Sequence, residues 1–213
     1  MKRMVAGLGL LIVVAAPAAV AEVGLGVKAG TLGVGIEGTF ALAGGLNLRA
    51  GVNNYTYGYS DSASDINYDI DLELKSYALL LDWHPFSGTF KLTAGLLSNK
   101  NHVAMRATPT GTVNIGGTPY PPATVGTLRG EIDFKKTAPY AGLGWGNAAG
   151  KTRGFGFSAE LGVLFQGAPD VTLTSTNPAV LQSDLDAEAR DIENDLDDLK
   201  AYPVISLGFS YQF

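Results

Sequence analysis

The sequence predicts an all-β fold, an eight-stranded antiparallel transmembrane β-barrel with one short amphipathic helix in its last extracellular loop. Three observations predict it. Large apolar residues alternate with small or polar ones along most of the chain. Charged residues make up 16% of the sequence, against about 25% in ordinary soluble domains. Glycine accounts for 28 of the 213 residues, nearly twice its usual share of about 7%.

The N-terminal 21 residues have the features of a cleaved secretory signal peptide. Lys2 and Arg3 precede an apolar run, and Ala19 and Ala21 form a cleavage site of the A-x-A type. An uncleaved membrane anchor is the alternative, because the uncharged run that ends at Ala21 is long enough to cross a bilayer. The short basic start and the small-residue site favour cleavage, which leaves residues 22–213 as the barrel.

Eight segments of the mature chain alternate with the period of a strand, in which successive side chains point to opposite faces. In each segment one face is large and apolar and the other is small or polar. The predicted strands are 23–30, 34–42, 46–53, 76–83, 90–97, 141–146, 155–166 and 204–213.

The composition of the small or polar face distinguishes a soluble β fold from a transmembrane barrel. A soluble β-sandwich or lipocalin-like barrel would turn its apolar face inward, but its outer face would then carry many more lysines and glutamates than this chain has. A transmembrane barrel turns the apolar face to lipid and fills a narrow lumen with small and polar residues. The alternation therefore favours the transmembrane barrel.

The predicted connections also differ between the two ends of the barrel. Short turns at 43–45, 84–88 and 147–154 share one end with the C-terminus, and aromatic residues gather near them. Longer loops occupy the other end, roughly Tyr59 to Ile66, Ala107 to Thr127 and Thr174 to Lys200. Short periplasmic turns, long extracellular loops and an aromatic girdle are typical of bacterial outer-membrane barrels. We therefore expect a multi-pass protein of the bacterial outer membrane, in contact with its lipids and lipopolysaccharide.

The polar face of the strands carries a candidate site. Six charged residues are expected to point into the lumen, and an eight-stranded barrel leaves an interior just wide enough for side chains. Because an unpaired buried charge is costly, they must pair or stay hydrated. They form either an ion-pair network that plugs the barrel or a polar lining that selects solutes. The residues are Lys28, Glu37, Arg49, Asp82, Lys91 and Glu160.

A second charged feature lies between the last two strands. From Pro178 to Lys200, apolar residues recur at helical spacing from Leu181 to Leu199. The other faces carry eight carboxylates against Arg190 and Lys200, and we expect a solvated helix that caps the extracellular mouth.

Composition excludes several other functions. The chain has no cysteine and only two histidines, so cysteine-based or histidine-rich metal sites are not expected. His102 has no recognisable serine or aspartate motif with which to form a hydrolase triad. With a net charge of −5, the chain has no basic footprint for nucleic acid. We expect no enzymatic activity, no metal and no cofactor.

The C-terminal strand ends in alternating aromatic residues. Phe209, Tyr211 and the terminal Phe213 resemble the signal that the barrel-assembly machinery of Gram-negative outer membranes reads. They are the predicted assembly signal.

Several segments, in the same order along most of the mature chain, resemble the CarO-type eight-stranded outer-membrane proteins. The resemblance implies a monomeric barrel linked to slow entry of small solutes, notably basic amino acids and carbapenems. CarO-type chains often end in Trp, whereas this chain ends in Phe213. The segments are Tyr68–Leu72 running on to Trp83–Pro85, Arg129–Gly130 with Ala138–Gly144, Glu160–Val163, Gly167–Leu173, and the charged helical stretch before Tyr202–Val204.

Two functions follow from these predictions. The first is passive, low-conductance uptake of small solutes, preferentially cations such as basic amino acids. The alternative is a structural or interaction barrel with a plugged lumen that presents extracellular loops. The lumen charges belong to both functions, and conductance separates them.

Overall fold

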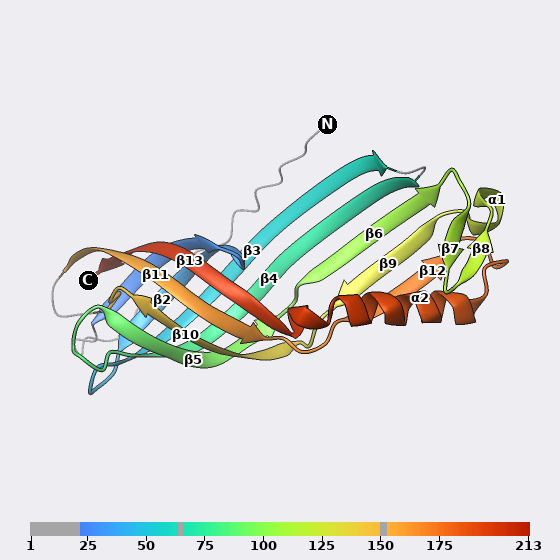
Figure 1. Ribbon diagram of the computed structural model, residues 1–213. Helices are drawn as coiled ribbons and strands as arrows, with labels where there is room; N and C mark the ends of the chain where they lie inside the picture. The colour runs from blue at the N-terminus through green and yellow to red at the C-terminus, as the bar shows by residue number, and fades with distance from the viewer. Residues whose placement is uncertain (1–21, 64–65, 150–152) are drawn as a thin grey trace.

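The computed structural model describes residues 22–63, 66–149 and 153–213. The predicted cleavage site at Ala19 and Ala21 lies outside them. Within the described residues there are thirteen strands, two α-helices and one 3-10 helix (Figure 1). The strands are β1 (Val23–Gly30), β2 (Gly33–Ala41), β3 (Leu46–Ala63), β4 (Ile66–Trp83), β5 (Phe90–Asn99), β6 (His102–Pro109), β7 (Val113–Ile115), β8 (Thr118–Tyr120), β9 (Leu128–Asp133), β10 (Thr137–Trp145), β11 (Gly154–Phe165), β12 (Asp170–Ser175) and β13 (Ala201–Gln212). The helices are α1 (Pro122–Val125), α2 (Gln182–Asp195) and the 3-10 helix η1 (Asp197–Lys200).

Eight strands close into a ring. Neighbours pair antiparallel in the order β1, β2, β3, β4, β5, β10, β11 and β13, and β13 pairs back onto β1. The closing ladder runs from Gly24 opposite Gln212 to Gly30 opposite Ser206. The all-β prediction and the eight predicted passages are therefore confirmed as one antiparallel sheet that contains a ring of eight strands.

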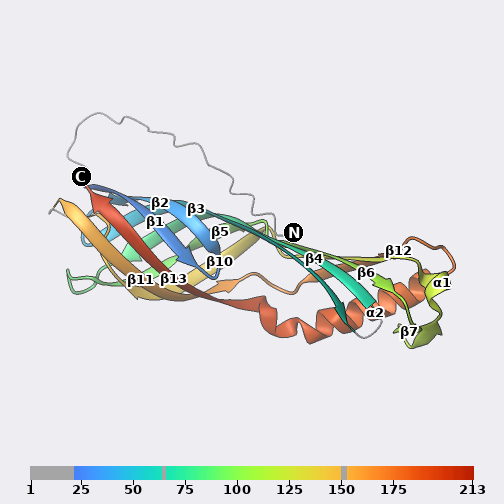
Figure 2. The same ribbon diagram turned by 90° about the horizontal axis from the view of Figure 1, so that it is seen from above.

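Five of the eight strand segments that form the ring are continued by further strand structure outside it. The residues of β4 opposite β5 and those opposite β6 keep one register, with Ser76 facing Asn99 and Glu73 facing His102. β9 and β10 share a register in the same way, with Asp133 facing His102 and Thr137 facing Ser98. The five continuing strands form a curved sheet that reaches far past the ring (Figures 1 and 2). We call it the extension: residues 54–63 of β3 and 66–73 of β4, with β6, β9 and β12.

The extension corrects the predicted loops. The segment Tyr59 to Ile66 was predicted as a loop, but β3 runs to Ala63 and β4 begins at Ile66. The predicted loop from Ala107 to Thr127 contains the end of β6, the hairpin of β7 and β8, and the helix α1. Alternation was expected only in the strands of the barrel, but it persists in strands that pair outside the ring.

The predicted helix also differs from the structure. It was expected from Pro178 to Lys200 as the only helix, over the barrel mouth. The α-helical part is Gln182–Asp195, a 3-10 turn follows, and α1 is a second, four-residue helix. In both views α2 runs away from the ring along the extension (Figures 1 and 2). The correction has a physical cause, because the apolar stripe of α2 packs on the extension.

An apolar cluster fixes α2 in that position. Leu185 and Ala189 of α2 are buried against Val171 and Leu173 of β12. Carboxylates of α2 add polar contacts. The backbone N–H of Gly116 donates to Glu188 Oε2 at 2.9 Å, and that of Val171 donates to Glu193 Oε1 at 2.9 Å.

A third carboxylate joins α2 to the β7–β8 hairpin. The Tyr120 hydroxyl donates to Asp184 Oδ2 at 2.8 Å, and this hydrogen bond lowers the pKa of Asp184 below its usual value. Asp184, Glu188 and Glu193 were expected to be solvated over the barrel mouth, but they form hydrogen bonds that fix the position of the helix.

The outward faces of ring and extension differ in polarity. Odd-numbered residues of β4 are exposed along its whole length. Between Tyr77 and Trp83 they are aromatic or leucine, whereas between Asn67 and Lys75 they are polar or charged. The even-numbered residues are large and apolar or aromatic from Ile66 to Leu74, whereas from Ser76 to Asp82 they are a mixture of polar and apolar residues. The outward polarity of one continuous strand therefore switches between Lys75 and Tyr77.

Aromatic side chains surround the end of the ring where the C-terminus lies. Phe90 contacts Trp145 with ring centroids 5.8 Å apart, and Phe155 contacts Tyr211 at 5.0 Å. Phe86 and Phe155 are strongly exposed and Trp145 is half-exposed, whereas Phe90 and Tyr211 are more covered. None of the helices in the described part of the chain is long and apolar enough to cross a membrane.

Candidate functional site: the filled interior of the ring

The inward side chains of the ring are stacked in four layers. From the C-terminal end toward the extension they are an amide layer, a charge layer, an apolar layer and a second amide layer. Two strands show the order directly: β3 contributes Asn47, Arg49 and Asn53, and β5 contributes Lys91, Leu97 and Asn99. Alternation places each of these residues on the inner face.

The charge layer brings together all six charged residues named from the sequence. Arg49 lies at its centre and makes the most contacts. Its Nε and Nη2 bond both oxygens of Asp82, at 2.8 and 2.9 Å. Its Nη1 is 3.1 Å from Glu37 Oε2, and its Nη2 is 2.6 Å from Glu160 Oε2. One guanidinium thus holds three carboxylates.

Two lysines complete the charge layer. Lys91 Nζ lies 2.9 Å from Glu160 Oε2 and 3.4 Å from Asp82 Oδ2, and Lys28 Nζ lies 3.2 Å from Glu37 Oε2. Two of the carboxylates also accept hydrogen bonds from hydroxyl groups. Tyr140 Oη donates to Glu160 Oε1 at 2.7 Å, and Thr93 Oγ1 donates to Asp82 Oδ1 at 2.6 Å. Three cations and three anions form one neutral, nearly buried network.

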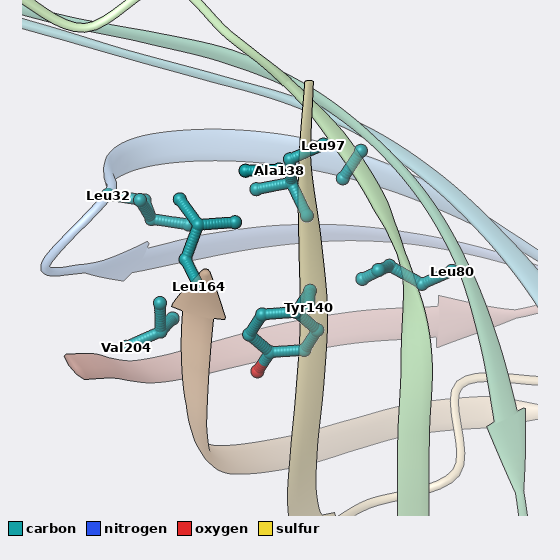
Figure 3. Close-up of a cluster of buried hydrophobic side chains, with 8 residues drawn as sticks. Leu32, Leu80, Leu97, Ala138, Tyr140, Leu164 and Val204 are labelled. Carbon is teal, nitrogen blue, oxygen red and sulfur yellow. The ribbon is translucent and has the colours of Figure 1, made fainter. Parts of the chain in front are cut away.

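The apolar layer closes the ring on the extension side of the charge layer and was not predicted from the sequence. Leu80, Leu97 and Leu164 were assigned to the small or polar face, although they are large, buried and in mutual contact. Figure 3 shows them converging with Leu32, which enters from the β1–β2 turn. Large apolar residues recur at corresponding inward positions of neighbouring strands. This pattern in the sequence could have predicted the layer. Its members are Leu32, Ala78, Leu80, Leu97, Ala138, Tyr140, Leu164 and Val204.

Tyr140 joins the apolar layer to the charge layer. Its ring lies among the leucines (Figure 3), and its hydroxyl donates to Glu160. The ring crosses two glycines: a Cβ on Gly142 would lie 2.6 Å from the Tyr140 hydroxyl oxygen, and one on Gly162 would lie 2.7 Å from a ring carbon. The small residues of the lumen face therefore make room for the large ones that fill it.

Amide side chains close both ends of the interior. Toward the extension, Asn53 Nδ2 donates to Ser76 Oγ at 2.9 Å, and Asn99 Nδ2 donates to Gln166 Oε1 at 3.2 Å. At the other end, Asn47 Nδ2 lies 3.3 Å from His84 Nε2. These groups hydrogen-bond one another, as most buried polar groups do, although the buried Asn53 Oδ1 has no partner among the described residues.

The segment after β10 is part of the lower closure. Asn47 Nδ2 also donates to Asn147 Oδ1 at 3.1 Å, and Gln212 Nε2 donates to the carbonyl oxygen of Asn147. His84 Nδ1 lies 3.1 Å from the carbonyl oxygen of Gly88, so the hydrogen on Nδ1 leaves Nε2 to accept from Asn47. The short turns at 84–88 and 147–149 thus cover the ring from below.

Little space remains between the layers. A cavity of about 20 Å³ lies beside the apolar layer and is lined by residues of three layers, among them Lys28, Leu32, Tyr140 and Asn53. A cavity of this volume holds about one water molecule. Within the described residues, no group of three or more His, Asp or Glu side chains is arranged to hold a metal ion. His102 lies outside this interior and pairs with Asp133 at 3.0 Å.

The three aromatic residues of the predicted assembly signal lie on the outer surface of β13 and just after it. Phe209 contacts Phe157 with ring centroids 5.3 Å apart, and Tyr211 contacts Phe213 at 5.1 Å. The backbone N–H of Phe213 donates to the carbonyl oxygen of Val23 at 2.9 Å, at the seam where β13 meets β1. Their role as a signal stays a prediction.

Comparison with known proteins gives structural matches alone. No family model matches the chain, and no curated protein matches it significantly. The crystal structure of CarO2 of Acinetobacter baumannii matches with a TM-score of 0.61 and 24% identity, over 90% of this chain and 98% of that one. The crystal structure of CarO of Acinetobacter baumannii matches with a TM-score of 0.59 and 22% identity, over 89% and 97%. The resemblance to the CarO-type proteins is therefore confirmed at the level of the fold: this chain has the fold of the CarO structures.

Proposed function

We propose that the ring is an outer-membrane β-barrel with a closed lumen, and that it holds the extension rigidly at the cell surface. The observation that carries the proposal is the polarity switch on β4. Outward residues from Tyr77 to Trp83 are apolar and exposed, whereas outward residues from Asn67 to Lys75 are polar. Exposed leucines in a row are costly in water and favourable in lipid.

The height of the apolar belt supports a membrane. From Lys75 to Trp83 the strand rises about 26 Å at about 3.3 Å per residue. Strands of membrane barrels tilt by about 40°, which leaves about 20 Å of height, close to the apolar band of about 25 Å in such barrels. The ring also leaves no open sheet edge in that region, because every strand pairs on both sides.

The orientation and assembly partners follow from the two ends. Short turns and the aromatic girdle mark the periplasmic end, so the extension lies outside the cell. The proposal includes cleavage of the signal peptide, insertion by the barrel-assembly machinery with Phe213 as part of its signal, and a monomer in contact with lipid and lipopolysaccharide. It assigns the chain no catalysis and no cofactor.

The filled interior favours presentation of the extension over transport. Four layers of side chains stand in series across the lumen, and the charge layer is held by six ion pairs. A solute would have to displace paired charges and the leucines above them. The long strands, by contrast, build a stiff sheet outside the ring, braced by α2.

Cell fractionation and gel migration test the proposal. We expect the mature chain to begin at Glu22, to be recovered with the outer membrane, and to migrate differently on a gel before and after heating in SDS, because a closed barrel resists SDS until it is boiled. Recovery in the soluble periplasm, or identical migration of heated and unheated samples, would contradict it.

Slow uptake of small cations is a second candidate, favoured by the acidic surface of α2. Asp186, Asp191, Asp195 and Asp198 are exposed and form no ion pair within the described residues. Such carboxylates raise the local cation concentration over a Debye length of about 8 Å at physiological salt.

Reversal potentials in reconstituted bilayers separate the two candidates. The closed-lumen proposal expects no resolvable conductance steps. The uptake candidate expects a cation preference at low salt that disappears when Asp186, Asp191, Asp195 and Asp198 are changed to Asn. If the cation preference survives this change, the carboxylates of α2 are not its cause.

A further inference from the structure

We propose that four lysines at the junction of ring and extension bind the phosphate groups of an outer-leaflet lipid headgroup. The inference rests on the proposed function, because it needs the ring in a membrane. It goes beyond that proposal in assigning a lipid site to particular residues. We call Lys75, Lys100, Lys135 and Lys136 the junction lysines.

Only some of the lysines in the described residues form ion pairs with carboxylates. The described residues contain seven lysines. Lys28 and Lys91 belong to the charge layer, and Lys200 pairs with Asp197 at 2.5 Å. The other four are the junction lysines, which are exposed and have no carboxylate within 4.0 Å in the described part of the chain.

The junction lysines come from neighbouring strands at one level. The backbone N–H of Lys100 donates to the carbonyl oxygen of Lys75 at 2.8 Å, and that of Asn99 donates to the carbonyl oxygen of Lys136 at 2.8 Å. Register explains the clustering, because the β5–β6 connection lies beside Lys75 of β4 and the β9–β10 connection lies beside the β5–β6 connection.

Their level coincides with the polarity switch. Lys75 is the last charged outward residue of β4 before the apolar belt, and Tyr77 is the first residue of the belt. Lys100 Nζ lies over the Tyr77 ring, 5.5 Å from its centroid. A tyrosine with a cation above it marks the interface between acyl chains and headgroups. The junction lysines therefore lie where the phosphates of a lipid would lie.

Nearby carboxylates do not neutralise this cluster. Glu73, Asp133 and Asp170 form the next row of the outer face, further from the ring. Asp133 pairs with His102, and within the described residues none of the three carboxylates lies within 4.0 Å of a junction lysine. Like charges carried by adjacent segments of the sheet at one level repel one another, and a doubly phosphorylated headgroup would relieve that repulsion. The apolar belt below would take the acyl chains of the same molecule.

The test uses the full mature protein in phosphatidylcholine nanodiscs that contain a diphosphorylated glycolipid. Two further arms are measured with the protein in the same discs. One contains the glycolipid without its phosphates, and the other contains phosphatidylcholine alone with inorganic phosphate added to the buffer. Thermal unfolding followed by fluorescence of Trp83 and Trp145 is the readout. We expect the phosphorylated glycolipid alone to raise the unfolding temperature, with a half-saturating amount that increases with salt.

The variant changes all four junction lysines to Gln, and a matched control changes Arg106, Arg129, Arg153 and Arg190 to Gln. The lysine variant should need about tenfold more glycolipid, because each cation near an anionic surface contributes to binding. The control should bind like the wild type. Equal binding by the lysine variant, equal loss in the control, or the same shift with inorganic phosphate would overturn the inference. A wild type that does not insert into bilayers fails the proposed function instead.

Discussion

Replacing Arg49 with Met is expected to destabilise the ring by about 3–5 kcal/mol, as is usual when one member of a buried ion-pair group is removed. Arg49 is 3% exposed and contacts Glu37, Asp82 and Glu160. Without it, three carboxylates share two lysines in a space that excludes water. The expected result is a lower urea midpoint for unfolding from lipid vesicles.

The control for Arg49→Met is Arg106→Met. Arg106 lies exposed on the outer face of the extension and forms no ion pair within the described residues. This change should stay within about 0.5 kcal/mol of wild type, as is usual for exposed positions. Arg49→Lys keeps the charge but loses the two-pronged contact to Asp82, so it should fall between the two. If Arg49→Met and Arg106→Met have equal midpoints, the charge layer does not stabilise the ring.

The alternation of the sequence predicted the ring well because the strand period is a local property. Each predicted passage needed only the residues within it to show an inner and an outer face. The same alternation placed Arg49 and Glu160 on the inner face, although they are far apart in the chain. Their contact depends on ring closure through β1 and β13, which local patterns do not specify.

The apolar layer and the extension escaped prediction for a different reason. Leu97 and Leu164 were judged by the average polarity of their strand face, whereas a filled lumen is built level by level. In β4 the sequence carried the switch, since the odd-numbered outward residues are polar up to Lys75 and apolar from Tyr77. The polarity switch was not recognised, because only the segment from Ser76 to Trp83 was predicted to be a strand. The direction of α2 depends on which apolar surface is available, and that surface exists only once the extension forms.

A charge placed on the outer face of β4 is expected to have an effect that depends on depth. Leu79→Arg, at the middle of the apolar belt, should cost about 2–4 kcal/mol of unfolding free energy in vesicles, the range for arginine at the midplane of membrane barrels. Asp71→Arg, on the same face of the same strand but in the extension, should cost about 0–1 kcal/mol. Both residues are exposed, so packing inside the protein does not account for the difference.

Leu79→Ala serves as the matched control, because it removes the side chain without adding charge. It should lose much less than Leu79→Arg, since the larger cost comes from taking a guanidinium into hydrocarbon rather than from losing leucine contacts. A ring that stands in water gives the opposite pattern, because Leu79→Arg would then replace an exposed leucine with a well-hydrated side chain. Equal stabilities for Leu79→Arg and Asp71→Arg would therefore refute the membrane belt, whatever the lumen conducts.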